Sequence, residues 1–376
     1  MTDKFPLIDA GCFAGVVSQK TRDPKIMRIN YFDYFRAIAI LFVVAGHSYY
    51  PWHINSLPEM VIANLITGGT ALFVFISGFF FHRIFYPKFQ FWSFLIKKSK
   101  NVLLPYIVLS SVGFLFIVVI CDTPNPHIVG DVNGFNNIFL YLKYLWTGQI
   151  ITAYWYIPFI MIIFAISPLF IKYIDLSLIK QIYIFILLLV VSMLIHRPAH
   201  NLSPIHSVIY FTPLYMLGII FSNNEKSICN FIKNKSFILG IVTLLISVIQ
   251  VAENDSYGNY QKKEMLSYAG VDIIIIQKIF MIFFFLSILQ KIDKKEIKFL
   301  KYIASISFAI YLLHPWVLKY FSYLSITDYI SFLPGIILFP IKTILIIGIC
   351  LAVATLFKTI LGKRLPVPGS AHGNAR

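Results

Sequence analysis

The feature that most constrains this chain is a series of long apolar stretches that recur along most of its 376 residues. A helix that crosses the hydrocarbon core of a bilayer needs about 20 predominantly apolar residues. We therefore predict an all-α fold, a polytopic membrane helical bundle of about ten transmembrane helices. The expected spans cover approximately residues 32–51, 60–81, 102–121, 153–171, 179–196, 205–221, 236–252, 269–290, 302–321 and 331–357.

The composition agrees with a lipid environment. Hydrophobic residues make up 58% of the chain and charged residues 13%, whereas a soluble domain has about 25% charged residues. The net charge is +16, from 32 Lys and Arg against 16 Asp and Glu, and such a balance is common in proteins that bind nucleic acid. Here most charges lie between the apolar stretches, so we assign them to cytoplasmic loops. We expect the lipid bilayer as a partner, and no nucleic acid.

The loop charges predict an orientation, because cytoplasmic loops of membrane proteins carry an excess of Lys and Arg. With the N-terminus in the cytoplasm, the opposite loops hold few basic residues: Lys143, Arg197, Lys262 and Lys263, with Lys319 near an outer helix end. The cytoplasmic loops hold many more: Arg83, Lys88, Lys97, Lys98, Lys100, Lys172, Lys180, Lys226, Lys233, Lys235, Lys291, Lys294, Lys295, Lys298, Lys301, Lys358, Lys363 and Arg364. We therefore predict cytoplasmic N- and C-termini and a multi-pass location in the cell inner (cytoplasmic) membrane.

The chain is expected to divide into three parts. Residues 1–30 are of mixed polarity without the pattern of a signal peptide, and form a predicted cytoplasmic N-terminal segment. Residues 31–358 form the transmembrane domain, and residues 359–376 a polar, disordered tail. The four cysteines are scattered, with no His at ligand spacing. We therefore expect neither a disulfide framework nor a metal site.

The first apolar stretch contains three ionisable side chains. Arg36 and His47 are eleven residues, or three helical turns, apart, so they project from one helix face about 16 Å apart along its axis. Asp33 precedes Arg36 by three residues and can pair with it. Ionisable residues inside a membrane are costly and mark functional sites. The alternative is that Asp33 and Arg36 anchor the helix end at the interface, with His47 hydrogen-bonded outside.

A second polar stripe lies late in the chain. Ser307, Tyr311 and His314 fall at i, i+4 and i+7 of an otherwise apolar helix. Such a stripe lines a cavity or forms a hydrogen-bonded seam between helices. For the neighbouring pair Ser77 and Gly78 we expect the hydroxyl to line the cavity, and the glycine to be a close-packing point between helices.

The remaining polar and aromatic residues have simpler interpretations. Trp155 and Tyr156 are expected at the outer membrane interface, where aromatic residues concentrate. The other histidines are assigned to loops or helix ends, where a solvated imidazole costs little. They are His53, His82, His127, His196, His200, His206 and His372.

Four motifs occur in order between Asp33 and Pro315. They are Asp33-x-x-Arg36 with His47 eleven residues further on, Phe73-Val-Phe-Ile-Ser77-Gly78-Phe79, Trp155-Tyr156-Ile-Pro-Phe through Ser167-Pro168-Leu169, and Ser307-Phe-Ala-Ile-Tyr311-Leu-Leu-His314-Pro315. In this order and spacing they resemble the acyltransferase-3 family of integral membrane acyltransferases. One departure is Asn101, before Leu103-Leu104-Pro105-Tyr106, where the family commonly has Arg; Lys98 and Lys100 lie nearby.

The resemblance implies an enzyme that transfers an acyl group, usually acetyl, from acyl-CoA to a hydroxyl of a cell-surface glycan or a lipid-linked sugar precursor. Acyl-CoA would be a co-substrate, with no bound cofactor. Its phosphates would meet the basic residues Arg83, Lys98 and Lys100. The family's cavity or substrate-binding positions correspond here to Ser77, Trp155, Tyr311 and His314.

The catalytic residues implied are His47, Arg36 and Asp33. An imidazole works near neutral pH, so His47 is the predicted general base for the acceptor hydroxyl. Arg36 would bind a CoA phosphate or polarise the thioester, and Asp33 would orient Arg36. Transient acylation of His47 is the alternative route.

Two other classes of function remain open at this point. A transporter or flippase of a polyprenyl-linked glycan would use Arg36 and His47 as substrate or proton sites, although the paired broken helices common in transporters are not evident. A sensor or scaffold that kept the fold without the chemistry is the third class.

Overall fold

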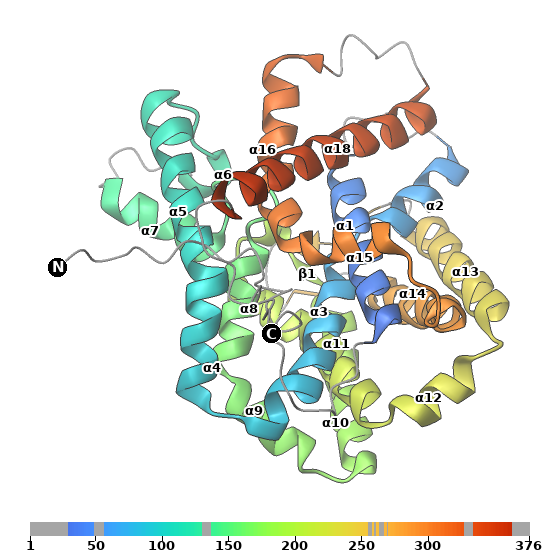
Figure 1. Cartoon of the computed structure of the whole chain (residues 1–376). Coiled ribbons are helices and arrows are strands. Elements are labelled where there is room, and N and C mark those ends of the chain that lie inside the picture. Colours follow the sequence, from blue (N-terminus) through green and yellow to red (C-terminus); the bar gives the residue numbers. More distant parts are fainter. Residues whose placement is uncertain are drawn as a thin grey trace, which may run out of the picture.

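The computed structural model describes residues 29–48, 56–129, 137–254, 258, 261–262, 267–268, 270–326 and 334–362, and these are helical almost throughout (Figure 1). Residues 1–28 and 363–376, which hold most of the predicted N-terminal segment and tail, lie outside the described residues.

The elements of the first half are α1 (Asn30–Ser48), α2 (Leu57–Ile66), α3 (Thr70–Phe80), η1 (Phe81–Phe85), η2 (Tyr86–Lys88), α4 (Phe91–Lys98), η3 (Ser99–Leu103), α5 (Leu104–Gly113), η4 (Phe114–Ile120), α6 (Pro126–Val129), α7 (Asn137–Thr147), α8 (Tyr156–Ala165) and α9 (Ser167–Ile174). Those of the second half are α10 (Leu178–Ile195), β1 (Arg197–Pro198), η5 (Ala199–Asn201), α11 (Pro204–Asn223), α12 (Glu225–Ile232), α13 (Ser236–Asn254), β2 (Gln261–Lys262), α14 (Ile274–Leu289), η6 (Gln290–Ile292), α15 (Lys298–Ser305), α16 (Ser307–Tyr323) and α18 (Gly335–Gly362).

The predicted membrane helical bundle is confirmed. Within the described residues, seven helices are long and apolar enough to cross a membrane, or up to nine if each of two bent pairs is one span. These nine correspond in position to the predicted spans from 60–81 onward. The first predicted span, 32–51, is the helix α1 but does not belong to that set. Polar and ionisable side chains make α1 less apolar, and the surrounding protein buries most of them.

Two predicted spans are bent. The span 153–171 consists of α8 and α9, which meet at 57°, and the span 302–321 consists of α15 and α16, which meet at 71°. Ser167-Pro168 starts α9, and Pro at the first turn of a helix is a recognised start signal. The second bend falls at Ser305-Ile306, with no Pro or Gly to announce it.

Helices α3 and α11 form the centre of the bundle, and their contact depends on two glycines. A Cβ atom on Gly78 would lie 1.9 Å from the carbonyl oxygen of Tyr215, and one on Gly218 would lie 2.1 Å from that of Phe75. Only residues without a side chain permit such a close approach. The expectation that Gly78 is a close-packing point is therefore confirmed.

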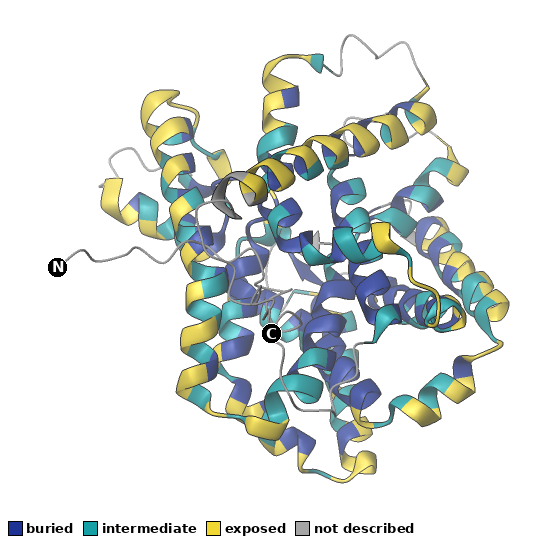
Figure 2. Ribbon diagram, viewed as in Figure 1, coloured by how far each residue is buried: buried dark blue, intermediate teal, exposed yellow. Residues whose placement is uncertain are grey.

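Burial separates the helices into two groups (Figure 2). In the apolar stretch of α11, 78% of the residues are buried within the protein, against 17% in that of α10 and 17% in that of α18. The inner group also includes α1 and α3, whereas α13 has a largely exposed apolar surface. We assign the exposed apolar faces to lipid.

Candidate active site

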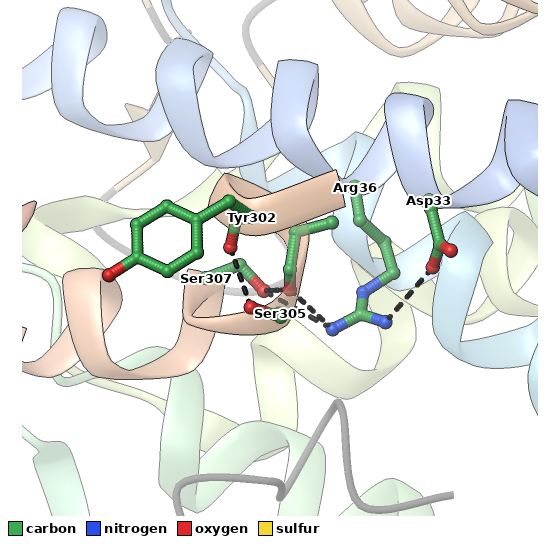
Figure 3. A network of polar contacts seen from close by, with 6 residues as sticks. Asp33, Arg36, Tyr302, Ser305 and Ser307 are labelled. Atoms are coloured by element: carbon green, nitrogen blue, oxygen red, sulfur yellow. Dashed lines mark hydrogen bonds and ion pairs between the residues drawn. The ribbon is translucent and has the colours of Figure 1, made fainter. Parts of the chain in front are cut away.

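Arg36 of α1 reaches the bend between α15 and α16 (Figure 3). Its Nη2 atom donates hydrogen bonds to the carbonyl oxygen of Ala304 at 2.8 Å and to the Ser307 hydroxyl at 3.4 Å. Its Nη1 atom lies 3.7 Å from Oδ1 of Asp33, which is the expected i,i+3 ion pair. Arg36 is only 2% exposed. A cation at the carbonyl end of α15 also suits the helix dipole there, so Arg36 holds the bend in place.

His47 lies near His314 of α16, at the other end of the polar face of α1. Their ring centroids are 5.5 Å apart. His314 is fully buried, and its Nδ1 is 3.1 Å from the carbonyl oxygen of Ile310. Because a carbonyl only accepts, Nδ1 carries the proton, and Nε2 is left as a hydrogen-bond acceptor. Nε2 has no hydrogen-bond partner among the described residues. The fold thus brings the two histidines together. His47 lies about one helical turn after Val43 in α1, and His314 lies about one helical turn after Tyr311 in α16.

A small, partly open cavity lies against the face of α1 between Arg36 and His47. Its walls come from four helices and are mostly apolar. They comprise Val43, Thr70, Phe73, Tyr156, Ser307, Phe308 and Tyr311. Val43 lies seven residues after Arg36 and four before His47, on the same helix face. The two ionisable positions therefore flank an apolar cavity.

Tyrosine hydroxyls fix the segment before α8 to α16. Tyr311 donates a hydrogen bond to the carbonyl oxygen of Ala153 at 2.5 Å, and Tyr154 donates one to that of Leu312 at 2.8 Å. The indole of Trp316 in turn donates to the Tyr154 hydroxyl at 3.0 Å. These contacts hold the Trp-Tyr motif beside the polar stripe of α16.

Of the four predicted cavity residues, Tyr311 lines this cavity. His314 is the neighbour of Tyr311, with ring centroids 6.0 Å apart. Ser77 is buried in α3 and close to Tyr156. Trp155 is buried too, although we expected it at the outer interface. The guanidinium carbon of Arg197 lies 4.5 Å from the centre of its indole ring, in a cation–π contact.

Sequence reasoning missed Arg197, which we placed in an outer loop. The residue is 5% exposed, and its Nε donates to Oδ1 of Asn201 at 2.7 Å. Strand β1, which starts at Arg197, pairs in parallel with β2. No pattern in the sequence distinguishes Arg197 from a solvated loop residue; only the tertiary fold does.

Sequence reasoning also passed over Lys278, inside the predicted span 269–290. Its Nζ donates hydrogen bonds to the carbonyl oxygens of Asn64 at 2.8 Å and Leu65 at 3.3 Å, at the end of α2. A cation at a helix C-terminus is favourable. The role of Lys278 is to hold the junction between α2 and α3.

The predicted donor-phosphate residues lie in three elements: Arg83 in η1, Lys98 in α4 and Lys100 in η3. Arg83 forms an ion pair of 2.5 Å with Glu225, which also accepts a hydrogen bond from Tyr31. The Lys98 ammonium lies 4.6 Å from the centre of the Phe85 ring. Lys100 is exposed. Their role in binding CoA stays a prediction.

The assignment of all the remaining histidines to solvated positions was wrong for two of them. His196 and His206 are buried, and their Nε2 atoms lie 2.8 Å and 3.0 Å from the carbonyl oxygens of Gly270 and His196, respectively. His200 is in the loop, stacked on His127 with ring centroids 3.8 Å apart. Partial burial, and then the neighbouring His127, lower the pKa of His200. Among the described residues no group of three or more His, Cys, Asp or Glu is placed to hold a metal ion.

Comparison with known protein families identifies the family to which the chain belongs. A family model described as an acyltransferase domain, Acyl_transf_3, matches residues 29–355. No curated protein and no solved structure matches the chain significantly. The matched region contains the Arg36 contact, the histidine pair and the cavity. The chain therefore belongs to the acyltransferase-3 family and is a membrane acyltransferase.

Proposed function

We propose that this acyltransferase moves an acyl group, most simply acetyl, from acyl-CoA to a hydroxyl of a cell-surface glycan or lipid-linked sugar precursor at the cell inner membrane. The observation that carries the proposal is the buried polar face shared by α1 and α16, with Arg36 at one end and the histidine pair at the other. Ionisable groups are costly in a membrane bundle unless they serve function.

In the proposed reaction His47 is the general base. It takes the proton of the acceptor hydroxyl as that oxygen attacks the thioester carbonyl carbon. The carbon–sulfur bond then breaks, and the CoA sulfur leaves with the electron pair and receives the proton from His47. The products are an oxygen ester on the acceptor and free CoA thiol, so no oxidant, reductant or metal is required.

The other residues support this step. Asp33 and Arg36 keep the bend between α15 and α16 closed beside the cavity, and Arg36 offers positive charge to the donor. His314 presents an acceptor nitrogen near His47. The cytoplasmic basic residues Arg83, Lys98 and Lys100 meet the donor phosphates.

The experiment uses membrane vesicles that contain the full chain, with acetyl-CoA labelled in the acetyl group. We expect label in a glycan fraction that is released by mild alkali, as an ester is, and mass spectrometry of the glycan should show the added acetyl group. Vesicles without the chain provide the background. Movement of an unmodified lipid-linked glycan across the membrane, without covalent labelling, would contradict the proposal and support a flippase.

A further inference from the structure

The cavity beside α1 is lined by a fully buried hydroxyl, that of Tyr156, which forms no hydrogen bond within the described residues. Three other residues with a hydroxyl line it: Tyr311 donates to Ala153, Ser307 donates to Ala304, and Thr70 is only partly buried. Tyr156 is 5% exposed, and its hydroxyl has no hydrogen-bond partner among the described residues. The great majority of buried polar groups are hydrogen-bonded. This one is therefore a candidate donor to a ligand.

The surroundings of Tyr156 sharpen this interpretation. The hydroxyl of Ser77 lies close enough to interact with it, yet neither oxygen completes a well-formed hydrogen bond within the described residues. Both hydroxyls are buried. Two buried hydroxyls on neighbouring helices, next to an otherwise apolar cavity, suit a ligand that has one acceptor oxygen and an apolar part.

The cavity also lies close to the two histidines, His47 and His314. Val43 lines it and precedes His47 by one helical turn, which is about 6 Å along the axis. The ring of Tyr156 is 5.8 Å from that of Tyr311, which is 6.0 Å from that of His314. Phe73 and Phe308 also line the cavity and form part of its apolar wall.

We infer that this cavity is the subsite for the transferred acyl group, with its carbonyl oxygen accepting a hydrogen bond from Tyr156 and its alkyl part between Phe73 and Phe308. This inference rests on the proposed function. Tyr156 would then be a catalytic residue, because the hydrogen bond strengthens as negative charge develops on that oxygen during attack. The aromatic walls limit the subsite to short acyl chains.

The first test replaces only the hydroxyl. Tyr156→Phe should lower kcat for acetyl transfer by about 10²–10³-fold, the usual effect of losing an oxyanion donor, with KM for acetyl-CoA changed by less than about threefold. Tyr215→Phe is the matched control, since Tyr215 also has a buried hydroxyl without a hydrogen-bond partner in the described part but does not line the cavity. An unchanged kcat in a folded Tyr156→Phe protein would overturn the role of Tyr156, as would an equal loss in Tyr215→Phe.

The second test does not depend on the stability of the Tyr156 variant. Phe308→Ala should raise the ratio of butyryl to acetyl transfer at least about tenfold, because each methylene that a pocket admits or rejects is worth about 10–200-fold. Phe357→Ala, on the exposed face of α18, should leave the ratio unchanged. An unchanged ratio in Phe308→Ala would overturn the subsite. Absence of transfer from every acyl-CoA by the unaltered chain would instead overturn the proposed function.

Discussion

The inner and outer helices of this bundle differ in how far they are buried and in which residues they present to their surroundings. The inner helix α11 is 78% buried in its apolar stretch, and its partner α3 contacts it through backbone atoms. The outer helices α10 and α18 are 17% buried and present large aliphatic side chains outward. In lipid the apolar surface has no reason to be hidden, so packing, hydrogen bonds and small residues hold the centre together. The polar residues that a soluble protein would expose are therefore collected inside this protein.

The largest effect should appear at an arginine of the buried interior, compared with one that is partly exposed. Arg36→Met removes the donor to Ala304 and the cation beside Asp33, and breaking a buried pair costs about 3–5 kcal/mol. Arg83→Met breaks a pair whose arginine is 33% exposed, which should cost about 0.2–1 kcal/mol. Denaturant-induced unfolding in detergent measures both. Equal losses would show that Arg36 does not hold the bend.

Glycines should behave differently in the two groups. Gly78→Ala places a methyl group against the Tyr215 carbonyl and should cost about 1–3 kcal/mol or more. Gly348→Ala, in α18, has open space around the added atom and should be neutral or stabilising, because Ala favours helices more than Gly does. The measurement is the thermal unfolding midpoint of each purified variant. Tolerance of Gly78→Ala would contradict the close contact of α3 and α11.

A smaller effect should separate two faces of a single outer helix. Ile346 of α18 is fully buried, whereas Ile344 is 68% exposed. Ile346→Val should therefore cost about 0.5–1.5 kcal/mol, the usual price of one buried methylene. Ile344→Val should have almost no effect, since lipid fills the space. The same unfolding assay compares the two variants. A larger loss of stability in Ile344→Val than in Ile346→Val would mean that the face of α18 with Ile344 packs against the bundle.

Much of the fold could be predicted from the sequence. Span length placed the membrane helices, because each crossing needs a long apolar run. The helical period placed Arg36 and His47 on one face, and Ser307, Tyr311 and His314 on another, and the structure joins these two faces. These are properties of single helices, which local sequence determines.

The rest depended on how helices meet. Arg197 comes from a loop that folds back onto Trp155, and Tyr156 lines the cavity instead of the membrane interface. The bend at Ile306 is held by Arg36, which is about 270 residues earlier in the chain. No local pattern records such contacts between distant segments. The residues missed were therefore those whose environment is created by tertiary packing.

The central claim is that the polar interior is a catalytic centre, not a structural seam. The most direct measurement is the rate of acetyl transfer from acetyl-CoA by His47→Ala, divided by the amount of folded protein. Loss of a general base should lower that rate by about 10²–10⁴-fold, while the unfolding midpoint stays close to that of the unaltered chain. Full activity in a folded, membrane-inserted His47→Ala protein would contradict the claim.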